Sequence, residues 1–160
     1  MNTDIAPQDW PAPAQWSMLA GDAGRLLLFL AMASFLVAVI GSITNRLRVS
    51  RIGFAVGAGS VFISFGLLLS LTSTGQFHYR YVFAHSQADL EPWYRISAAW
   101  AGQEGSFLLW AVTSAMFVAL ARKKTGADER GYLGMASAFL MGLAGILTFE
   151  SPFRLIDPIL

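Results

Sequence analysis

The sequence has no cysteine and few charged residues, which sets it apart from ordinary soluble domains. None of its 160 residues is a cysteine, so disulfide scaffolds, thiolate metal sites and cysteine catalysis are excluded. Charged residues make up 13% of the chain, about half the usual share, whereas apolar residues make up 55%. The net charge of +1 gives no reason to expect a nucleic-acid partner. The length fits one domain, and the composition favours an integral membrane protein.

The sequence also lacks the motifs of the common soluble enzymes. It contains no Walker A loop, no GxGxxG opening a helix, no HExxH and no GxSxG. No aspartate or lysine interrupts the long apolar runs to mark a proton or ion path. A small independent transporter is disfavoured because no broken helix or buried charge pair marks a midplane site.

What is present is a set of long uncharged runs separated by clustered charges. The gaps hold 20 residues after Arg25, 28 after Arg51, 17 after Glu104 and 19 after Arg130. A helix needs about 20 apolar residues to cross a bilayer core. We therefore predict an all-α fold, an integral membrane four-helix transmembrane bundle with an aromatic-rich outer loop. The predicted spans are Leu26–Ser42, Ile52–Leu71, Trp100–Ala121 and Tyr132–Phe149.

The basic residues predict the orientation of this bundle. The connections 45–51 and 122–131 hold seven of the eleven basic residues and two of the ten acidic ones. Short loops rich in Lys and Arg stay on the cytoplasmic side. Both termini and the long loop 72–99 are then expected to face outward.

Two flanking segments are expected to lie outside the four-helix domain, which we place at 25–150. Segment 1–24 lacks the basic start and the cleavage site of a signal peptide, and its three prolines argue against a helix. Trp10 and Trp16 suit a segment at the level of the lipid headgroups. The alternative is that segment 1–24 is a lid over a partner. Segment 151–160 is expected to be an outer tail.

Small residues at helical spacing predict close helix packing. Gly53 and Gly57 have GxxxG spacing in the second span, and Gly134, Ala138 and Gly142 follow one stripe of the fourth. Such spacing lets helix backbones approach closely within a membrane. The sequence leaves open whether the partners are helices of this chain or of other subunits.

The outer loop contains an alternation of aromatic and polar residues. Phe77, Tyr79, Tyr81 and Phe83 recur at every second position, which predicts an extended segment with one aromatic face. An interfacial aromatic belt explains this pattern, and we favour it. The alternative is a flat apolar shelf for a planar ligand or a partner.

Two histidines and one glutamate are the remaining candidate groups. Paired histidines can ligate heme iron, but two histidines in a polar loop, here His78 and His85, are usually no more than polar residues. Glu104 follows Trp100 by about one turn, so we expect both on one helix face. A carboxylate inside a span is costly unless it is paired, and its partner is expected to be Arg80, Arg95 or a group on another subunit.

A series of short motifs runs from the outer loop to the third span. It contains Trp93-Tyr94-Arg95, Ala98-Ala99-Trp100, Glu104-Gly105-Ser106 and Leu108-Leu109-Trp110, preceded by Phe77, Tyr81-Val82, Ser86, Leu90 and Pro92. In these residues and their order, the region resembles the CcmF/NrfE family of cytochrome c biogenesis proteins, the heme lyase subunits. After the fourth span, Ser151-Pro152-Phe153 is similar to the start of the family's large outer loop. Full members have more spans, a tryptophan-rich WWD segment and heme-ligating histidines, and none of these can be mapped onto this sequence.

The resemblance implies an N-terminal subunit or fragment of the cytochrome c heme lyase, a scaffold for heme attachment and not itself the catalyst. The implied membrane is the bacterial or mitochondrial inner membrane, with both termini on the periplasmic or intermembrane side. Implied partners are the remaining lyase subunits with the WWD loop, a heme chaperone and apocytochrome c. Heme is expected in the assembled complex and not on this chain alone. The alternative is a structural subunit of a larger respiratory or photosynthetic membrane complex.

Two groups of site residues follow from this resemblance. Contacts to heme or a partner are expected at six positions in the loop and its end: Phe77, His78, Tyr81, His85, Trp93 and Trp100. An assembly motif is expected at the head of the third span, at Trp100, Glu104, Gly105, Ser106 and Trp110.

Overall fold

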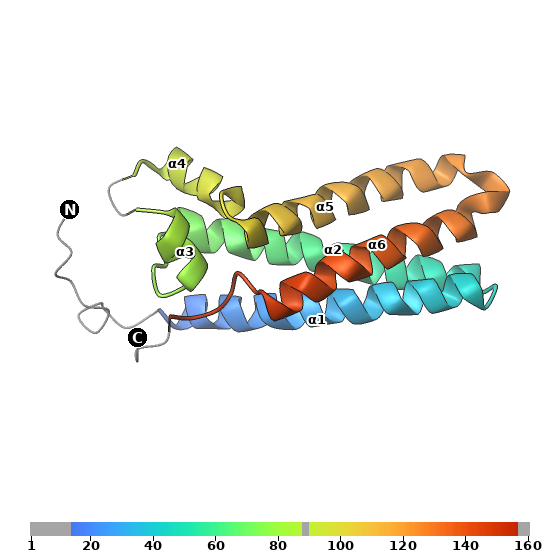
Figure 1. The fold of residues 1–160 in the computed structure, drawn as a ribbon, viewed down its shortest axis with the longest axis horizontal. Coiled ribbons are helices and arrows are strands. Elements are labelled where there is room, and N and C mark those ends of the chain that lie inside the picture. The colour runs from blue at the N-terminus through green and yellow to red at the C-terminus, as the bar shows by residue number, and fades with distance from the viewer. Residues whose placement is uncertain (1–13, 88–89, 157–160) are drawn as a thin grey trace.

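A computed structural model describes residues 14–87 and 90–156, with the side chain of Pro92 left out. Four long helices run side by side as a bundle, and shorter helices gather at one end (Figure 1). The long helices are α1 (Gln15–Ile43), α2 (Leu47–Ser73), α5 (Gln103–Ala121) and α6 (Glu129–Phe149). All four are long and apolar enough to cross a membrane. The predicted all-α membrane bundle is confirmed, and the described residues contain no β-strand.

The bundle has two unlike ends. One end, which we call the cap, carries α3 (Arg80–His85), α4 (Pro92–Ser97), the 3-10 turn Ala98–Trp100 and the segment 150–156, next to the start of α1 (Figure 1). The opposite end, which we call the basic end, carries the tight α1–α2 turn and the α5–α6 connection, with short 3-10 turns at Arg122–Lys124 and Gly126–Asp128.

Helix α1 packs against α2 and α6, and these are the most extensive contacts between the long helices. A Cβ added to Gly53 would come within 2.6 Å of the Ala38 nitrogen, so only glycine lets the two backbones meet there. The space beside Gly57 is filled in the same way by the ring of Phe35. The GxxxG spacing of α2 is therefore used within this chain.

The stripe predicted on α6 divides between two environments. Gly134 packs against Ser42 of α1, whose hydroxyl donates to the Arg130 carbonyl at 2.8 Å. Ala138 and Gly142 are exposed, and nothing lies within 4 Å of a Cβ built at Gly142. Only the first third of this stripe is a packing face within the chain.

Three of the four long helices extend beyond the predicted spans, whereas α5 begins later than predicted. Helix α1 begins at Gln15 and not at Leu26, which corrects the expectation that segment 1–24 is non-helical throughout. The apolar run marks only the part of the helix that lies in the hydrocarbon core of the bilayer. Backbone hydrogen bonds continue the helix through the polar residues outside that core. Trp16 lies in the first turn of α1 and is 46% exposed. The prolines and Trp10 lie outside the described residues.

Candidate functional site

Two aromatic side chains lock the cap onto the start of α1. The Tyr79 hydroxyl donates to the Ser17 carbonyl at 2.6 Å, and its ring fills the space beside Gly21. The ring of Phe153 fills the space beside Gly24 one turn later. Both aromatic residues are almost fully buried. A side chain at either glycine would displace a ring, so this end of α1 is shaped as a socket for the cap.

Two segments that are far apart in the sequence are hydrogen-bonded to each other beside this socket. The amide of Arg80 donates to the Arg154 carbonyl at 2.9 Å, and the amide of Ile156 donates to the His78 carbonyl at 2.9 Å. These two hydrogen bonds make Tyr79 and Leu155 an isolated antiparallel bridge. The segment after α6 is thereby joined to the start of α3.

Tyr81 organises the junction between α3 and α5. Its hydroxyl donates to the Ala98 carbonyl at 3.0 Å and accepts from the Gly102 amide at 3.1 Å. The ring is 3% exposed. Burial raises the pKa of Tyr81 to about 12, and the nearby charge of Glu104 contributes to the rise. The hydroxyl is therefore neutral at ordinary pH and serves as a fixed structural bridge.

This bridge breaks the helix that the sequence predicts from Trp100 onward. Trp100 ends a 3-10 turn, Gly102 is extended with φ −98° and ψ 171°, and α5 begins at Gln103. Trp100 and Glu104 therefore do not share one helix face, and that prediction is wrong. The cause is the Tyr81 hydroxyl, which bonds backbone groups on both sides of the break. Glu104 does lie in the first turn of α5, where the helix dipole favours a carboxylate.

The predicted extended aromatic face of the outer loop is also wrong. Residues Arg80–His85 form a short helix, so the alternating aromatics point in different directions. Tyr79 and Tyr81 are buried, Phe77 is half-buried and Phe83 is 55% exposed. Period two over four residues fits a turn followed by one helical turn as well as it fits a strand.

His85 is held beside Tyr81 and Gly102 and is half-buried. Its Nδ1 lies 2.9 Å from the Tyr81 carbonyl oxygen, and its ring stacks on that of Tyr81 with centroids 4.6 Å apart. The other nitrogen, Nε2, lies 2.5 Å from where a Cβ of Gly102 would be. His78 precedes α3 and is half-buried. No cluster of three or more metal-binding side chains occurs in the described ranges.

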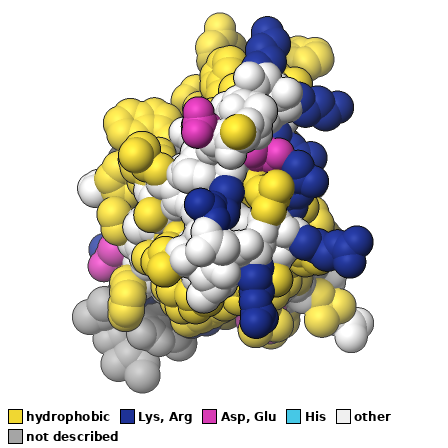
Figure 2. All heavy atoms as spheres, turned by 90° about the vertical axis from the view of Figure 1, so that its right-hand side faces the viewer, with side chains coloured by type: hydrophobic (Ala, Val, Ile, Leu, Met, Phe, Trp, Pro, Cys, Tyr) yellow, Lys and Arg dark blue, Asp and Glu magenta, His cyan; other side chains and the backbone are white. Residues whose placement is uncertain are grey.

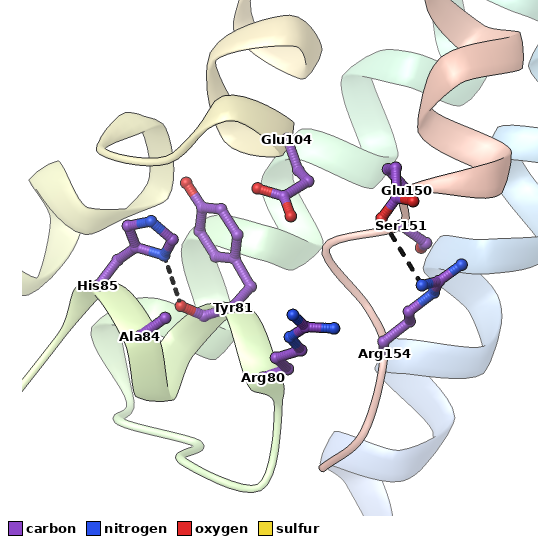
Figure 3. Close-up of a pocket in the computed structure, with 8 residues that line it drawn as sticks. All are labelled: Arg80, Tyr81, Ala84, His85, Glu104, Glu150, Ser151 and Arg154. Carbon is purple, nitrogen blue, oxygen red and sulfur yellow. Dashed lines mark hydrogen bonds and ion pairs between the residues drawn. The ribbon is translucent and has the colours of Figure 1, made fainter. Parts of the chain in front are cut away.

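A polar cavity of about 180 Å³ opens between α3, the head of α5 and the segment after α6 (Figure 3). Its charged groups are of both signs, and Glu150 pairs with Arg154 at 3.6 Å. Glu104 faces the same cavity as Arg80, but the structure records no ion pair between them. Arg95, the other predicted partner, donates to the Leu90 carbonyl at 3.0 Å. The full lining is Arg80, Tyr81, Ala84, His85, Glu104, Glu150, Ser151 and Arg154.

The large aromatic side chains of the predicted site lie mostly on the surface. Trp93 and Tyr94 of α4 are 78% and 64% exposed, and Trp100 is 41% exposed. Trp110 is 57% exposed on α5, with its ring edge against Phe107. Trp93, Trp100 and Trp110 are the exposed members of the predicted site, and Tyr94 adds to the exposed surface next to Trp93.

Of the two small residues of the predicted assembly motif, Gly105 is buried and Ser106 is half-buried. A Cβ at Gly105 would come within 2.1 Å of the Tyr81 hydroxyl, and the Ser106 hydroxyl donates to the Trp100 carbonyl at 2.9 Å. The space beside Gly105 is therefore filled by this chain itself and offers no room for a neighbouring subunit.

Sequence reasoning missed the residues that hold the cap together. No local pattern in the sequence marks Gly21, Gly24 and Gly102 as contact sites, or the hydroxyl groups of Tyr79 and Tyr81 as bridges between distant segments. The one signal available was the Ser-Pro-Phe motif at 151–153, which the resemblance singled out and whose phenylalanine fills the socket.

Comparisons with known proteins show which proteins this chain resembles in sequence and in fold. No protein-family profile matches the chain. Over 101 residues the chain is 31% identical to the cytochrome c-type biogenesis protein NrfE of Haemophilus influenzae, which covers 60% of this chain and 16% of that protein. The solved structure of the cytochrome c heme lyase CcmF matches with a TM-score of 0.71 and 22% identity, over 93% of this chain and 26% of that one. In sequence and in fold, this chain is similar to the CcmF/NrfE family. The predicted resemblance is confirmed, and the chain spans about a sixth to a quarter of the length of these relatives.

Proposed function

We propose that this chain is a membrane scaffold in cytochrome c biogenesis, the N-terminal subunit or fragment of a heme lyase. The match to CcmF over 93% of this chain carries the proposal, and the similarity to NrfE supports it. The bundle holds the cap at the outer face of the bacterial or mitochondrial inner membrane, with both termini on that side. The basic end then faces the opposite compartment, as its seven basic residues favour.

The role of the cap is to present a rigid surface and not to perform chemistry. Tyr79, Tyr81 and Phe153 fix the loop to the bundle, so α4 carries Trp93 and Tyr94 on a supported platform. Exposed aromatic residues on a rigid support are the side chains that most often dominate contacts with a partner. Partners of this surface are the remaining lyase subunits with the WWD loop, a heme chaperone and apocytochrome c. Heme belongs to that assembled complex.

The assembly role is assigned to the exposed members of the predicted motif. Trp100 and Trp110 offer apolar surface, and Glu104 offers a half-buried carboxylate at the head of α5. Gly105 and Ser106 contribute indirectly, because they shape the break that positions Trp100. Phe77, His78 and His85 are half-buried and help to hold the loop in place.

The test is to delete the gene in its own host and to stain membrane proteins for covalently bound heme. Loss of heme staining from c-type cytochromes, with their polypeptides still made, is the expected result. Restoration by the parent chain, but not by a Trp93→Ala/Tyr94→Ala variant present at equal level, assigns the function to the cap. Intact heme staining together with loss of another membrane complex contradicts the proposal and favours the structural-subunit alternative.

A further inference from the structure

The basic end of the bundle has a strong positive charge that its own acids do not neutralise. The connections 45–51 and 122–131 hold seven basic and two acidic residues, a net charge of +5. Dark blue Lys and Arg side chains project from this end over much of its rim (Figure 2).

One of the two acidic residues, Glu129, already forms an ion pair within the chain. Glu129 accepts hydrogen bonds from Arg51 Nε at 2.9 Å and from Arg51 Nη2 at 2.5 Å, and Arg122 Nη1 lies 4.0 Å away. This pairing joins the two connections and fixes their relative position. It leaves Asp128 as the acid against the five remaining cations: Arg46, Arg48, Lys123, Lys124 and Arg130.

A wide hollow of about 660 Å³ lies beside this charge, at the start of α6. Lys124, before the 3-10 turn Gly126–Asp128, and Arg130, after it, both line the hollow, and the lining residue Tyr132 is half-buried. Asp128 also lines it, so the hollow contains two cations and one anion.

The hollow continues into an apolar stripe along α6. Gly131, which lines the hollow, is followed on the same helix face by Met135, Phe139, Gly142 and Ile146, at steps of three or four residues. Met135 is 80% exposed, Phe139 56% and Ile146 46%, and Gly142 forms a gap in the ridge. A cationic hollow that leads into an apolar strip matches a molecule with an anionic head and a hydrocarbon tail.

We propose that this hollow binds an anionic phospholipid. The phosphate of the headgroup lies between Lys124 and Arg130, and an acyl chain follows Met135 and Phe139 along α6. Basic groups near a membrane surface attract anionic lipids by about 1 kcal/mol each, which is about fivefold in affinity. The bound lipid holds the α5–α6 connection at the membrane surface.

The experiment is native mass spectrometry of the full chain in detergent, titrated with phosphatidylglycerol or with phosphatidylcholine of the same acyl chains. We expect phosphatidylglycerol to be retained at several-fold lower concentration. The Lys124→Gln/Arg130→Gln variant should weaken its retention by about 25-fold, five for each cation, and leave phosphatidylcholine unchanged. Asp128→Asn should tighten it, an effect that no folding defect can produce.

The matched control is Arg25→Gln, which removes an exposed cation from the cap end of α1 and should change nothing. Equal retention of the two lipids by the parent chain would overturn the proposal, as would a double variant that retains phosphatidylglycerol as the parent does. Displacement of the lipid by glycerol 3-phosphate would also overturn it, because the ligand would then be a soluble phosphate.

Discussion

The hydroxyl oxygen of Tyr81 lies where a side chain at Gly105 would begin. A Cβ built at Gly105 would come within 2.1 Å of that oxygen and 2.0 Å of the Ala99 carbonyl oxygen. The closest approach of the loop to α5 therefore depends on the absence of one methyl group. The hydrogen bonds from Tyr81 to Ala98 and from Gly102 to Tyr81 depend on the same spacing.

Gly105→Ala should open the junction between α3 and α5. Inserting a methyl group into a filled space typically costs about 1–3 kcal/mol, and the Tyr81 hydrogen bonds would be lost with it. We expect faster cleavage of the loop near Gln87 by protease and a lower midpoint of thermal unfolding. The matched control is Gly142→Ala, also in a long helix, where a Cβ meets nothing within 4 Å. Equal behaviour of the two variants would contradict the packing described for Tyr81.

The stability of the cap should fall at alkaline pH because of Tyr81. Its pKa is raised from 10.0 to about 12 by burial, so the folded chain holds the phenolic proton more tightly than the unfolded chain does. The resulting stabilisation is complete below pH 10 and is lost as the pH rises from 10 to about 12. A titration of tyrosinate absorbance with protease protection should show both changes in that interval. Tyr81→Phe should reduce the pH dependence of protection between these values, and the part that remains is assigned to Tyr79, whose pKa is also raised by burial.

Phe153→Ala should release the segment after α6 from the start of α1. Truncating a buried phenylalanine typically costs about 3–5 kcal/mol, and this ring is 1% exposed against Gly24. Phe149→Ala removes the same ring from a position that is 75% exposed and should have little effect. The measurement is chemical unfolding of both variants in the same detergent. Similar losses of stability would show that the socket at Gly24 does not hold the cap.

The isolated chain should bind no heme in stoichiometric amount. The His85 ring stacks on Tyr81 and its Nδ1 lies 2.9 Å from the Tyr81 carbonyl oxygen, so one of its two ring nitrogens is already engaged within the chain. A reduced-minus-oxidised absorption spectrum of the purified chain checks this. A bis-histidine signal that disappears in His78→Ala or His85→Ala would contradict the prediction and make those residues ligands.

The orientation of the bundle can be tested because the chain has no cysteine of its own. Single cysteines at Ala127 and at Gln87, both exposed, report on the basic end and on the cap. In intact cells an impermeant thiol reagent should label residue 87 and not residue 127. The reverse pattern would place the cap in the cytoplasm and contradict the proposed function.

The sequence predicted the spans well and the cap poorly, for one physical reason. Insertion of a helix into a bilayer depends on the composition of that helix alone, so the uncharged runs located all four long helices. The break at Gly102 depends on a hydroxyl 21 residues earlier in the chain, and no local pattern carries that information. The alternation from Phe77 to Phe83 does not form one aromatic face. Tyr79 and Tyr81 both point inward, because the first donates a hydrogen bond to Ser17 and the second to Ala98.

The segment after α6 pairs with the loop before α3, so the parts of the cap can come together only in a certain order during synthesis. Tyr79 bridges Leu155, and Phe153 fills the space beside Gly24, yet the ribosome makes these partners far apart in time. If α6 crosses the membrane as proposed, the segment after α6 reaches the socket only once that helix is inserted. Until then the start of α1 and the loop before α3 lack the residues that cover them. The assembled cap therefore marks chains in which all four helices of the bundle are in place, and a partner that recognises its surface selects those chains.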